Sequence, residues 1–298
     1  MMTQELKSYP SGGRFRLGVR AHDFGRLPAE ELAAKIASKG LVCTQLALTK
    51  AIAGLNLQPG QLNPGLAFDI GQAFLRHRVQ IAVLGCYINP LHPDPATRTK
   101  LLDWFKEHLR FARDFGCGLV ALETGSLNAD YSPHRDNHGE HAFQQSIASL
   151  ATLVAEAERF GVVVGIEGVA HHAVSTPSRI RTALDILRSP NVQVVFDPVN
   201  LLSSENHPDQ DRIIRESFDL FGDRMAVIHA KDFIITNGSV ASVPMGMGDF
   251  HHGLLLDTAA TRKPGISILF EETDELGVAH SMDFIRGLEI TSRNAGET

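Results

Sequence analysis

GLVALE at residues 118–123 and VVVGIE at residues 162–167 are two short apolar runs, and they flank the longer stretch HAFQQSIASLATLVAEAERFG at residues 141–161. Both runs are rich in valine, leucine and isoleucine, which is typical of buried β-strands. The stretch between them carries apolar residues at helical spacing and ends at Gly161, a common helix terminus. A strand, a helix and a second strand in this order predict a βαβ unit with two parallel strands.

Apolar runs of the same kind alternate with amphipathic stretches along the rest of the chain. They are RLGVRA (16–21), LVCTQLAL (41–48), QIAVLGCYI (80–88), VQVVFD (192–197), MAVIHA (225–230) and ISILFE (266–271). Eight strands that alternate with helices predict an α/β fold, and a closed (β/α)₈ TIM barrel uses all eight without leaving a sheet edge. The 298 residues suit a single such domain. We expect it to span residues 14–290, with flexible termini at residues 1–13 and 291–298.

The connections between these elements differ in length on the two sides of the strands. Those that enter strands are short, such as FG before VVVGIE and SPN before VQVVFD. Those that leave strands are long, such as GSLNADYSPHRDNHGE after Glu123 and KDFIITNGSVASVPMGMGDFHHG after MAVIHA. In a barrel, the loops that leave the strands build the active face, so this asymmetry predicts where the functional site lies.

Composition excludes several classes of protein. Hydrophobic residues make up 43% of the chain and charged residues 21%, as in ordinary globular proteins, and the net charge of -6 offers no broad positive surface for nucleic acid. The 3 cysteines are widely spaced and form no CxxC pair, which indicates a reducing compartment. The N-terminal segment lacks the apolar core of a signal peptide, and no apolar run approaches the roughly 18 residues of a spanning helix. We expect a cytoplasmic protein with no nucleic-acid and no membrane partner, and a homo-oligomer stays open.

Four of the predicted strands have a residue that can bind a metal at or next to their last position: Glu167, Asp197, His229 and Glu271. A lone acidic residue at a strand end is more often a helix cap or a salt-bridged structural residue, but four in consecutive strands are harder to explain in that way. Carboxylates with one imidazole form a mixed nitrogen and oxygen ligand set suited to Mn²⁺, Mg²⁺, Co²⁺ or Zn²⁺. The pattern predicts one divalent metal site at the mouth of the barrel.

Such a site favours chemistry on a sugar. A carbonyl and an adjacent hydroxyl of a small sugar can both bind one metal ion, which then stabilises the ene-diolate formed when a neighbouring carboxylate removes the α-proton. Reprotonation of the ene-diolate gives either an epimer or the aldose–ketose isomer. The same intermediate can instead expel a β-hydroxyl, so a dehydratase acting on a keto-inositol-type polyol is an alternative, and a non-catalytic sugar-binding barrel is another.

Further polar residues close to predicted strand ends are candidates for binding the substrate. His92 and Glu123 could hydrogen-bond sugar hydroxyls, and His172 lies just beyond Glu167. Lys231 lies on the same side of its strand as the histidine two residues before it, where it contacts either a substrate hydroxyl or phosphate, or a ligand carboxylate. Alternation along ISILFEE leaves open whether Glu271 or the adjacent Glu272 faces the site.

Seven short motifs occur in an order and spacing that resemble a known family. They are INPLHPD (88–94), LETGS (122–126), IEG (166–168), FDPVN (196–200), HAKD (229–232), MGMGDF (245–250) and LFEE (269–272). The chain resembles the sugar phosphate isomerase/epimerase family, also called xylose isomerase-like TIM barrels. The resemblance implies that Glu167, Asp197, His229 and Glu271 hold one divalent metal, and that Glu167 and Glu271 are the acid/base pair.

One position departs from the family pattern. Several epimerases have Asp-x-x-His where this chain has Asp197-Pro198-Val199-Asn200, so an asparagine replaces a histidine that contacts substrate. Asn200 is therefore a further candidate for binding the substrate, and we expect a specificity different from that of the ketose 3-epimerases. The DNA-repair nuclease of the superfamily uses a histidine at this position in its trinuclear zinc site, so Asn200 argues against nuclease activity.

Overall fold

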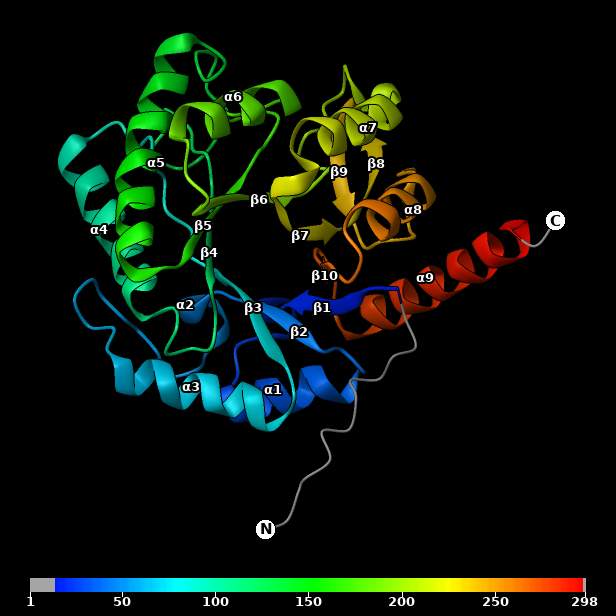
Figure 1. The fold of residues 1–298 in the computed structure, drawn as a ribbon, viewed down its shortest axis with the longest axis horizontal. Coiled ribbons are helices and arrows are strands. Elements are labelled where there is room, and N and C mark those ends of the chain that lie inside the picture. The colour runs from blue at the N-terminus through cyan, green and yellow to red at the C-terminus, as the bar shows by residue number, and fades with distance from the viewer. Residues whose placement is uncertain (1–13, 297–298) are drawn as a thin grey trace.

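The protein forms a closed barrel of eight parallel strands, as predicted (Figure 1). The computed structural model describes residues 14–296, with side chains described through residue 288. Neighbouring strands follow the order β1-β10-β7-β6-β5-β4-β3-β2, and the barrel closes between β2 and β1. The strands are β1 (Arg16–Arg20), β2 (Cys43–Leu46), β3 (Gln80–Gly85), β4 (Leu119–Glu123), β5 (Val163–Glu167), β6 (Val192–Phe196), β7 (Met225–Ala230) and β10 (Ser267–Phe270).

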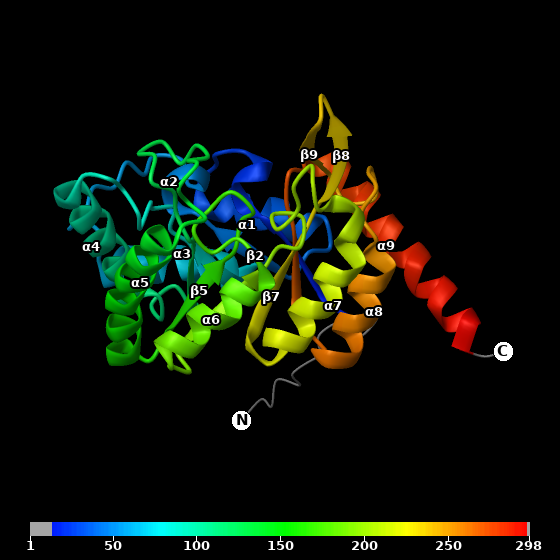
Figure 2. The same cartoon turned by 90° about the horizontal axis from the view of Figure 1, so that it is seen from above.

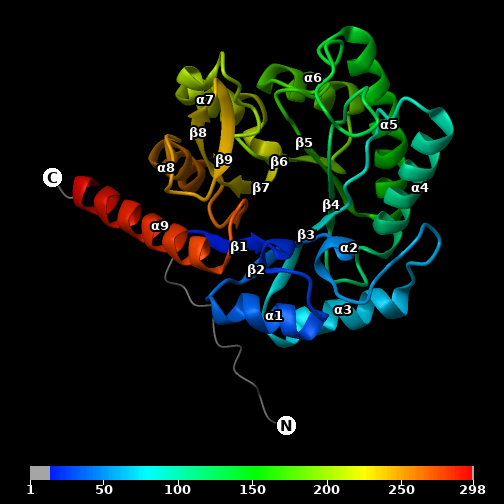
Figure 3. The same ribbon diagram turned by 180° about the vertical axis from the view of Figure 1, so that it is seen from behind.

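Helices surround the barrel on the outside (Figures 1 and 3). The longer ones are α1 (Ala29–Ser38), α3 (Pro64–Arg76), α4 (Pro95–Phe111), α5 (Glu140–Phe160), α6 (Pro177–Leu187), α7 (Gln210–Phe221), α8 (His252–Arg262) and α9 (Glu275–Gly296). Short turns of helix complete the set: α2 (Leu48–Ala51), η1 (Ala21–Phe24), η2 (His207–Asp209) and η3 (Gly222–Arg224). None of the helices within residues 14–296 has both the length and the apolar character needed to cross a membrane.

Local sequence signals account for several helix ends. The Thr176 side chain accepts a hydrogen bond from the Arg179 backbone N–H, so it caps α6 just before Pro177. Gly161 ends α5 in the left-handed conformation, with φ of 61°. Helix α9 continues to Gly296, past residue 290 where we placed the end of the domain, and that boundary stays a prediction. Residues 1–13 of the predicted flexible termini lie outside the described residues, as do residues 297–298.

Two apolar layers hold the barrel together. The larger lies between the strands and the helices, whereas the smaller consists of strand residues that point into the barrel. The inner residues are Cys43, Val83, Leu119, Ala121, Val195, Val227 and Leu269. Side chains alternate along a strand, so residues two or four positions further on also point inward, at the carboxyl end of the barrel. That end is where the predicted site residues lie.

A β-hairpin rises from this face, and we did not predict it. It consists of β8 (Asp232–Thr236) and β9 (Ser239–Val243), which pair in antiparallel fashion beyond the end of β7 (Figure 2). Asn237 and Gly238 form the turn with positive φ values of 51° and 72°. An Asn-Gly pair between β-prone segments is a strong hairpin signal, so the sequence contained the information. The long connection after MAVIHA, which we expect from the sequence to be a loop, therefore contains this hairpin.

Candidate metal centre

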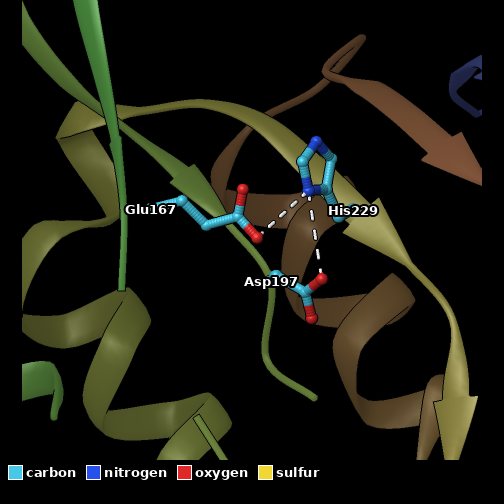
Figure 4. A group of neighbouring side chains, drawn as sticks. All are labelled: Glu167, Asp197 and His229. Atoms are coloured by element: carbon cyan, nitrogen blue, oxygen red, sulfur yellow. Dashed lines mark ion pairs between the residues drawn. The ribbon is translucent and has the colours of Figure 1, made fainter. Parts of the chain in front are cut away.

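Three predicted ligands meet at the carboxyl end of the barrel. Glu167 ends β5, Asp197 follows β6 and His229 lies on β7, so three adjacent strands supply them (Figure 4). His229 Nδ1 lies 3.5 Å from Glu167 Oε1 and 3.9 Å from Asp197 Oδ2. One potential ligand atom from each residue lies within 4.8 Å of the others, and all three side chains are buried. The three residues could hold one metal ion.

The fourth predicted residue, Glu271, borders this group. Its Oε1 lies 3.2 Å from His229 Nδ1, and its side chain is buried. Glu272 is exposed and pairs with Arg20 across 3.0 Å, and no contact joins it to His229. The sheet explains the difference, because Leu269 belongs to the barrel interior and Glu271, two residues later, shares its face.

Lys231 lies among the carboxylates. Its Nζ is 2.7 Å from Asp197 Oδ2 and 3.2 Å from Glu271 Oε2, and the side chain is only 5% exposed. Of the two roles considered from the sequence, its contacts in the structure are those of a partner for ligand carboxylates. Arg20 also lies 3.7 Å from Glu271 Oε2, so two cationic side chains face the carboxylates of this site. Buried carboxylates need compensating positive charge, and a divalent cation could add to what Lys231 and Arg20 supply.

His229 presents one ring nitrogen to the carboxylates and the other to an amide. Its Nδ1 is buried without a hydrogen-bond partner, whereas Nε2 lies 2.9 Å from Gln45 Oε1. Burial disfavours the imidazolium, but the charges of Glu271 and Glu167 outweigh this effect and raise the pKa of His229 to about 9. The environment of Nδ1 therefore attracts positive charge. An unpartnered imidazole nitrogen with surrounding carboxylate oxygens is a suitable donor set for a divalent metal.

Asn200 contacts two of the predicted ligands. Its side-chain amide donates a hydrogen bond of 2.6 Å to Glu167 Oε1, and its backbone N–H donates one of 2.9 Å to Asp197 Oδ1. These contacts orient both carboxylates. The asparagine that departs from the family pattern is therefore at the centre, where it supports the acidic residues directly.

Glu123 and His172 form a second polar group beside the first. Glu123 lies opposite Glu167 in the pairing of β4 with β5, and its Oε2 is 3.5 Å from His172 Nδ1. Burial and the nearby charge of Glu167 raise the pKa of Glu123 to about 7. Burial, with a smaller contribution from His171, lowers the pKa of His172 to about 3, and neither of its ring nitrogens has a hydrogen-bond partner. Two buried, neutral imidazole nitrogens next to a carboxyl group are available to bind a polar ligand.

His92 has a different environment. Its Nδ1 accepts a hydrogen bond of 3.2 Å from the Asp94 backbone N–H, and its carbonyl accepts one from Arg98. Asp94 in turn caps α4. His92 follows the third strand in the sequence, as predicted. Its hydrogen bonds are to the residues at the start of α4, and none is to Glu167 or His229.

Two residues at the site, Gln45 and Tyr87, were not predicted from the sequence as functional residues. Gln45 lies in the middle of LVCTQLAL, and Tyr87 is the next-to-last residue of QIAVLGCYI, so each was interpreted as part of a core strand. The signal for Gln45 was a polar amide at an inward position of an apolar run, two residues after Cys43.

Comparisons with known proteins agree with this architecture. Residues 13–288 match the sequence model of the family described as Xylose isomerase-like TIM barrel, whereas no curated protein matches the chain. A solved D-tagatose 3-epimerase-like protein is 16% identical, with a TM-score of 0.73, over 94% of this chain and 100% of its own. A D-psicose 3-epimerase from Clostridium cellulolyticum H10, crystallised with D-tagatose, is 13% identical, with a TM-score of 0.69, over 92% of this chain and 99% of its own.

A third structure contains a metal. The xylose isomerase-like TIM barrel protein from Mycobacterium smegmatis in complex with magnesium is 16% identical, with a TM-score of 0.68, over 92% of this chain and 96% of its own. At these identities the likeness to the solved structures is one of fold. The family model covers nearly the whole barrel, and on that basis this protein belongs to the xylose isomerase-like TIM barrel family.

Proposed function

We propose that the protein is a divalent-metal-dependent isomerase or epimerase of a small sugar or sugar derivative. The observation that carries the proposal is that Glu167 and Glu271 approach the same nitrogen, His229 Nδ1, at 3.5 and 3.2 Å. They come from β5 and β10, which flank β6 and β7 in the barrel. Two buried carboxylates on either side of one point are suited to removing a proton from one face of a substrate carbon and returning it to the other.

The residues of the centre have different proposed roles. Glu167, Asp197, His229 and Glu271 would hold the cation, which supplies positive charge to substrate oxygens when bound. Asn200 donates to Glu167 and Lys231 donates to Glu271, at 2.6 and 3.2 Å, so each acid/base carboxylate has one oxygen held in place. The magnesium in the Mycobacterium smegmatis protein and the D-tagatose in the D-psicose 3-epimerase support a divalent cation and a ketose as starting points.

The test is solvent exchange with a panel of ketoses, aldoses, an inosose and their phosphates, incubated in D₂O with Mn²⁺. We expect at least one substrate to take up deuterium at the carbon beside its carbonyl and to yield an isomer of otherwise unchanged mass. A product lighter by one water would identify a dehydratase instead. Tight binding without exchange would identify a non-catalytic barrel and would contradict the proposal.

Glu123 and His172 are proposed to bind substrate hydroxyls. His172→Phe keeps the ring but removes both nitrogens, so we expect KM to rise about tenfold with a smaller change in kcat, as for one lost buried hydrogen bond of about 1.4 kcal/mol. The matched control is His171→Phe, because His171 is the exposed neighbour of His172. Steady-state kinetics on the substrate found by the exchange panel measures both. Equal KM values for the two variants would remove His172 from the substrate site.

A further inference from the structure

Gln45 connects two buried polar groups across the barrel interior. It lies on β2, its side chain points inward, and only 3% of the residue is exposed. Its Oε1 is 2.9 Å from His229 Nε2, and its Nε2 donates a hydrogen bond of 2.9 Å to the Tyr87 hydroxyl. The contact with His229 joins residues 184 positions apart in sequence.

The two nitrogens of His229 impose a requirement on this contact. Nδ1 faces Glu271, Glu167 and Asp197 at 3.2 to 3.9 Å, which is the side of the proposed metal ion. A histidine that binds a metal through Nδ1 carries its hydrogen on Nε2, because a neutral imidazole bound through one nitrogen is protonated at the other. This N–H is buried and needs an acceptor. The amide oxygen of Gln45 is the acceptor at hydrogen-bond distance.

The Tyr87 hydroxyl binds the donor end of the amide. An amide has a donor end and an acceptor end, and a reversed Gln45 would present its NH₂ group to the Nε2–H of His229, placing two donors face to face. With the NH₂ group bound to Tyr87, the oxygen remains for His229. Lys50 Nζ lies 4.0 Å from the centroid of the half-buried Tyr87 ring, and the His22 ring contacts it in a T-shaped arrangement with centroids 6.0 Å apart.

We infer that Gln45 is a positioning residue for the metal centre, which holds His229 with its Nδ1 lone pair directed at Glu167, Asp197 and Glu271, and that Tyr87 orients the Gln45 amide. The inference rests on the metal site of the proposed function. A hydrogen bond from the second nitrogen of a metal-binding histidine commonly goes to a carboxylate. A neutral amide here performs the same orientation without adding a further negative charge beside Glu167, Asp197 and Glu271.

Metal affinity tests the inference without reference to any substrate. For Gln45→Leu we expect the Kd for Mn²⁺ of the metal-free protein, measured by isothermal titration calorimetry, to rise about 10- to 100-fold, the usual loss when such a partner is removed. Gln45→Glu retains an acceptor and is expected to stay within about threefold of the parent. Gln193→Leu is the matched control, since Gln193 is two residues before the inward-facing Val195 on β6, at the opposite end of the barrel from the site. Its Kd should equal that of the parent.

A spectroscopic measurement separates orientation from general damage to the fold. In Zn²⁺-loaded protein labelled with ¹⁵N-histidine, the ring of His229, assigned by its loss in His229→Asn, should carry its hydrogen on Nε2. Tyr87→Phe keeps Gln45 and removes only the group that orients its amide, so it is the second variant should Gln45→Leu not fold. We expect a rise in Kd of several-fold for Tyr87→Phe, below that of a direct loss of the acceptor.

The outcomes separate this inference from the proposed function. If the parent protein binds no divalent cation, the metal site itself is wrong. If the parent binds Mn²⁺ and Gln45→Leu, or Tyr87→Phe in its place, keeps the parental Kd with the His229 hydrogen on Nε2, the metal site stands and the positioning role of Gln45 is overturned.

Discussion

Replacing His229 by alanine is expected to abolish stoichiometric binding of a divalent cation. The parent should bind one ion per chain, whereas His229→Ala should raise the Kd for Mn²⁺ by more than about 100-fold, because even indirect partners of a metal ligand contribute 10- to 100-fold. His229 Nδ1 is the imidazole nitrogen of the centre, and it lies 3.5 Å from Glu167 and 3.2 Å from Glu271, so its loss removes one of the predicted metal ligands. Metal content after dialysis, measured by inductively coupled plasma mass spectrometry, and calorimetric titration give both quantities.

Two adjacent glutamates provide the matched control for this experiment. Glu271→Gln should weaken Mn²⁺ binding, whereas Glu272→Gln should leave it unchanged, because Glu271 faces His229 and Glu272 is an exposed partner of Arg20. Both variants remove one negative charge from neighbouring positions, so a general charge effect would change both. Full metal occupancy in His229→Ala with the parental circular dichroism spectrum would contradict the site assignment.

The second large effect concerns the two proposed acid/base residues. Glu167→Gln and Glu271→Gln, assayed at saturating Mn²⁺, are each expected to lower kcat by about 10²- to 10⁴-fold, the usual contribution of a general acid or base. A glutamine cannot accept the proton that leaves the substrate carbon, and it cannot return one. Asn200 and Lys231 would still contact the amide oxygen of the respective glutamine, so the geometry around it is largely retained.

Which of the two epimers exchanges its α-proton tests the paired role more specifically than the fall in kcat does. If one glutamate acts on each face of the carbon, each variant should still exchange the α-proton of one epimer with D₂O and fail to exchange that of the other. The two variants should show opposite preferences. Proton NMR of each purified epimer in D₂O measures the loss of its α-proton signal. Loss of exchange for both epimers in one variant, with none lost in the other, would indicate a single base and contradict the paired role.

The prediction of the fold from sequence succeeded because the signals were local and repeated. The runs GLVALE and VVVGIE, and the long helical stretch between them, form a complete βαβ unit by themselves. Thr176 and Gly161 mark helix ends through contacts with residues only a few positions away. The hairpin of β8 and β9 also had a local signal in Asn237-Gly238, so it was missed by interpretation and not for lack of information.

For the candidate site, the sequence predicted some features and only the structure showed the others. The identities of Glu167, Asp197, His229 and Glu271, and their positions at strand ends, were readable from the chain because parallel strands of a barrel bring their carboxyl ends to one face. The sequence by itself therefore predicted Glu167, Asp197 and His229 as one group, and the structure places these three together. Only the tertiary structure decided between Glu271 and Glu272, since the inward face of β10 depends on how the strand pairs with β1 and β7. It alone joined Gln45 to His229, because a contact across 184 residues arises from closure of the barrel and leaves no local pattern in either strand.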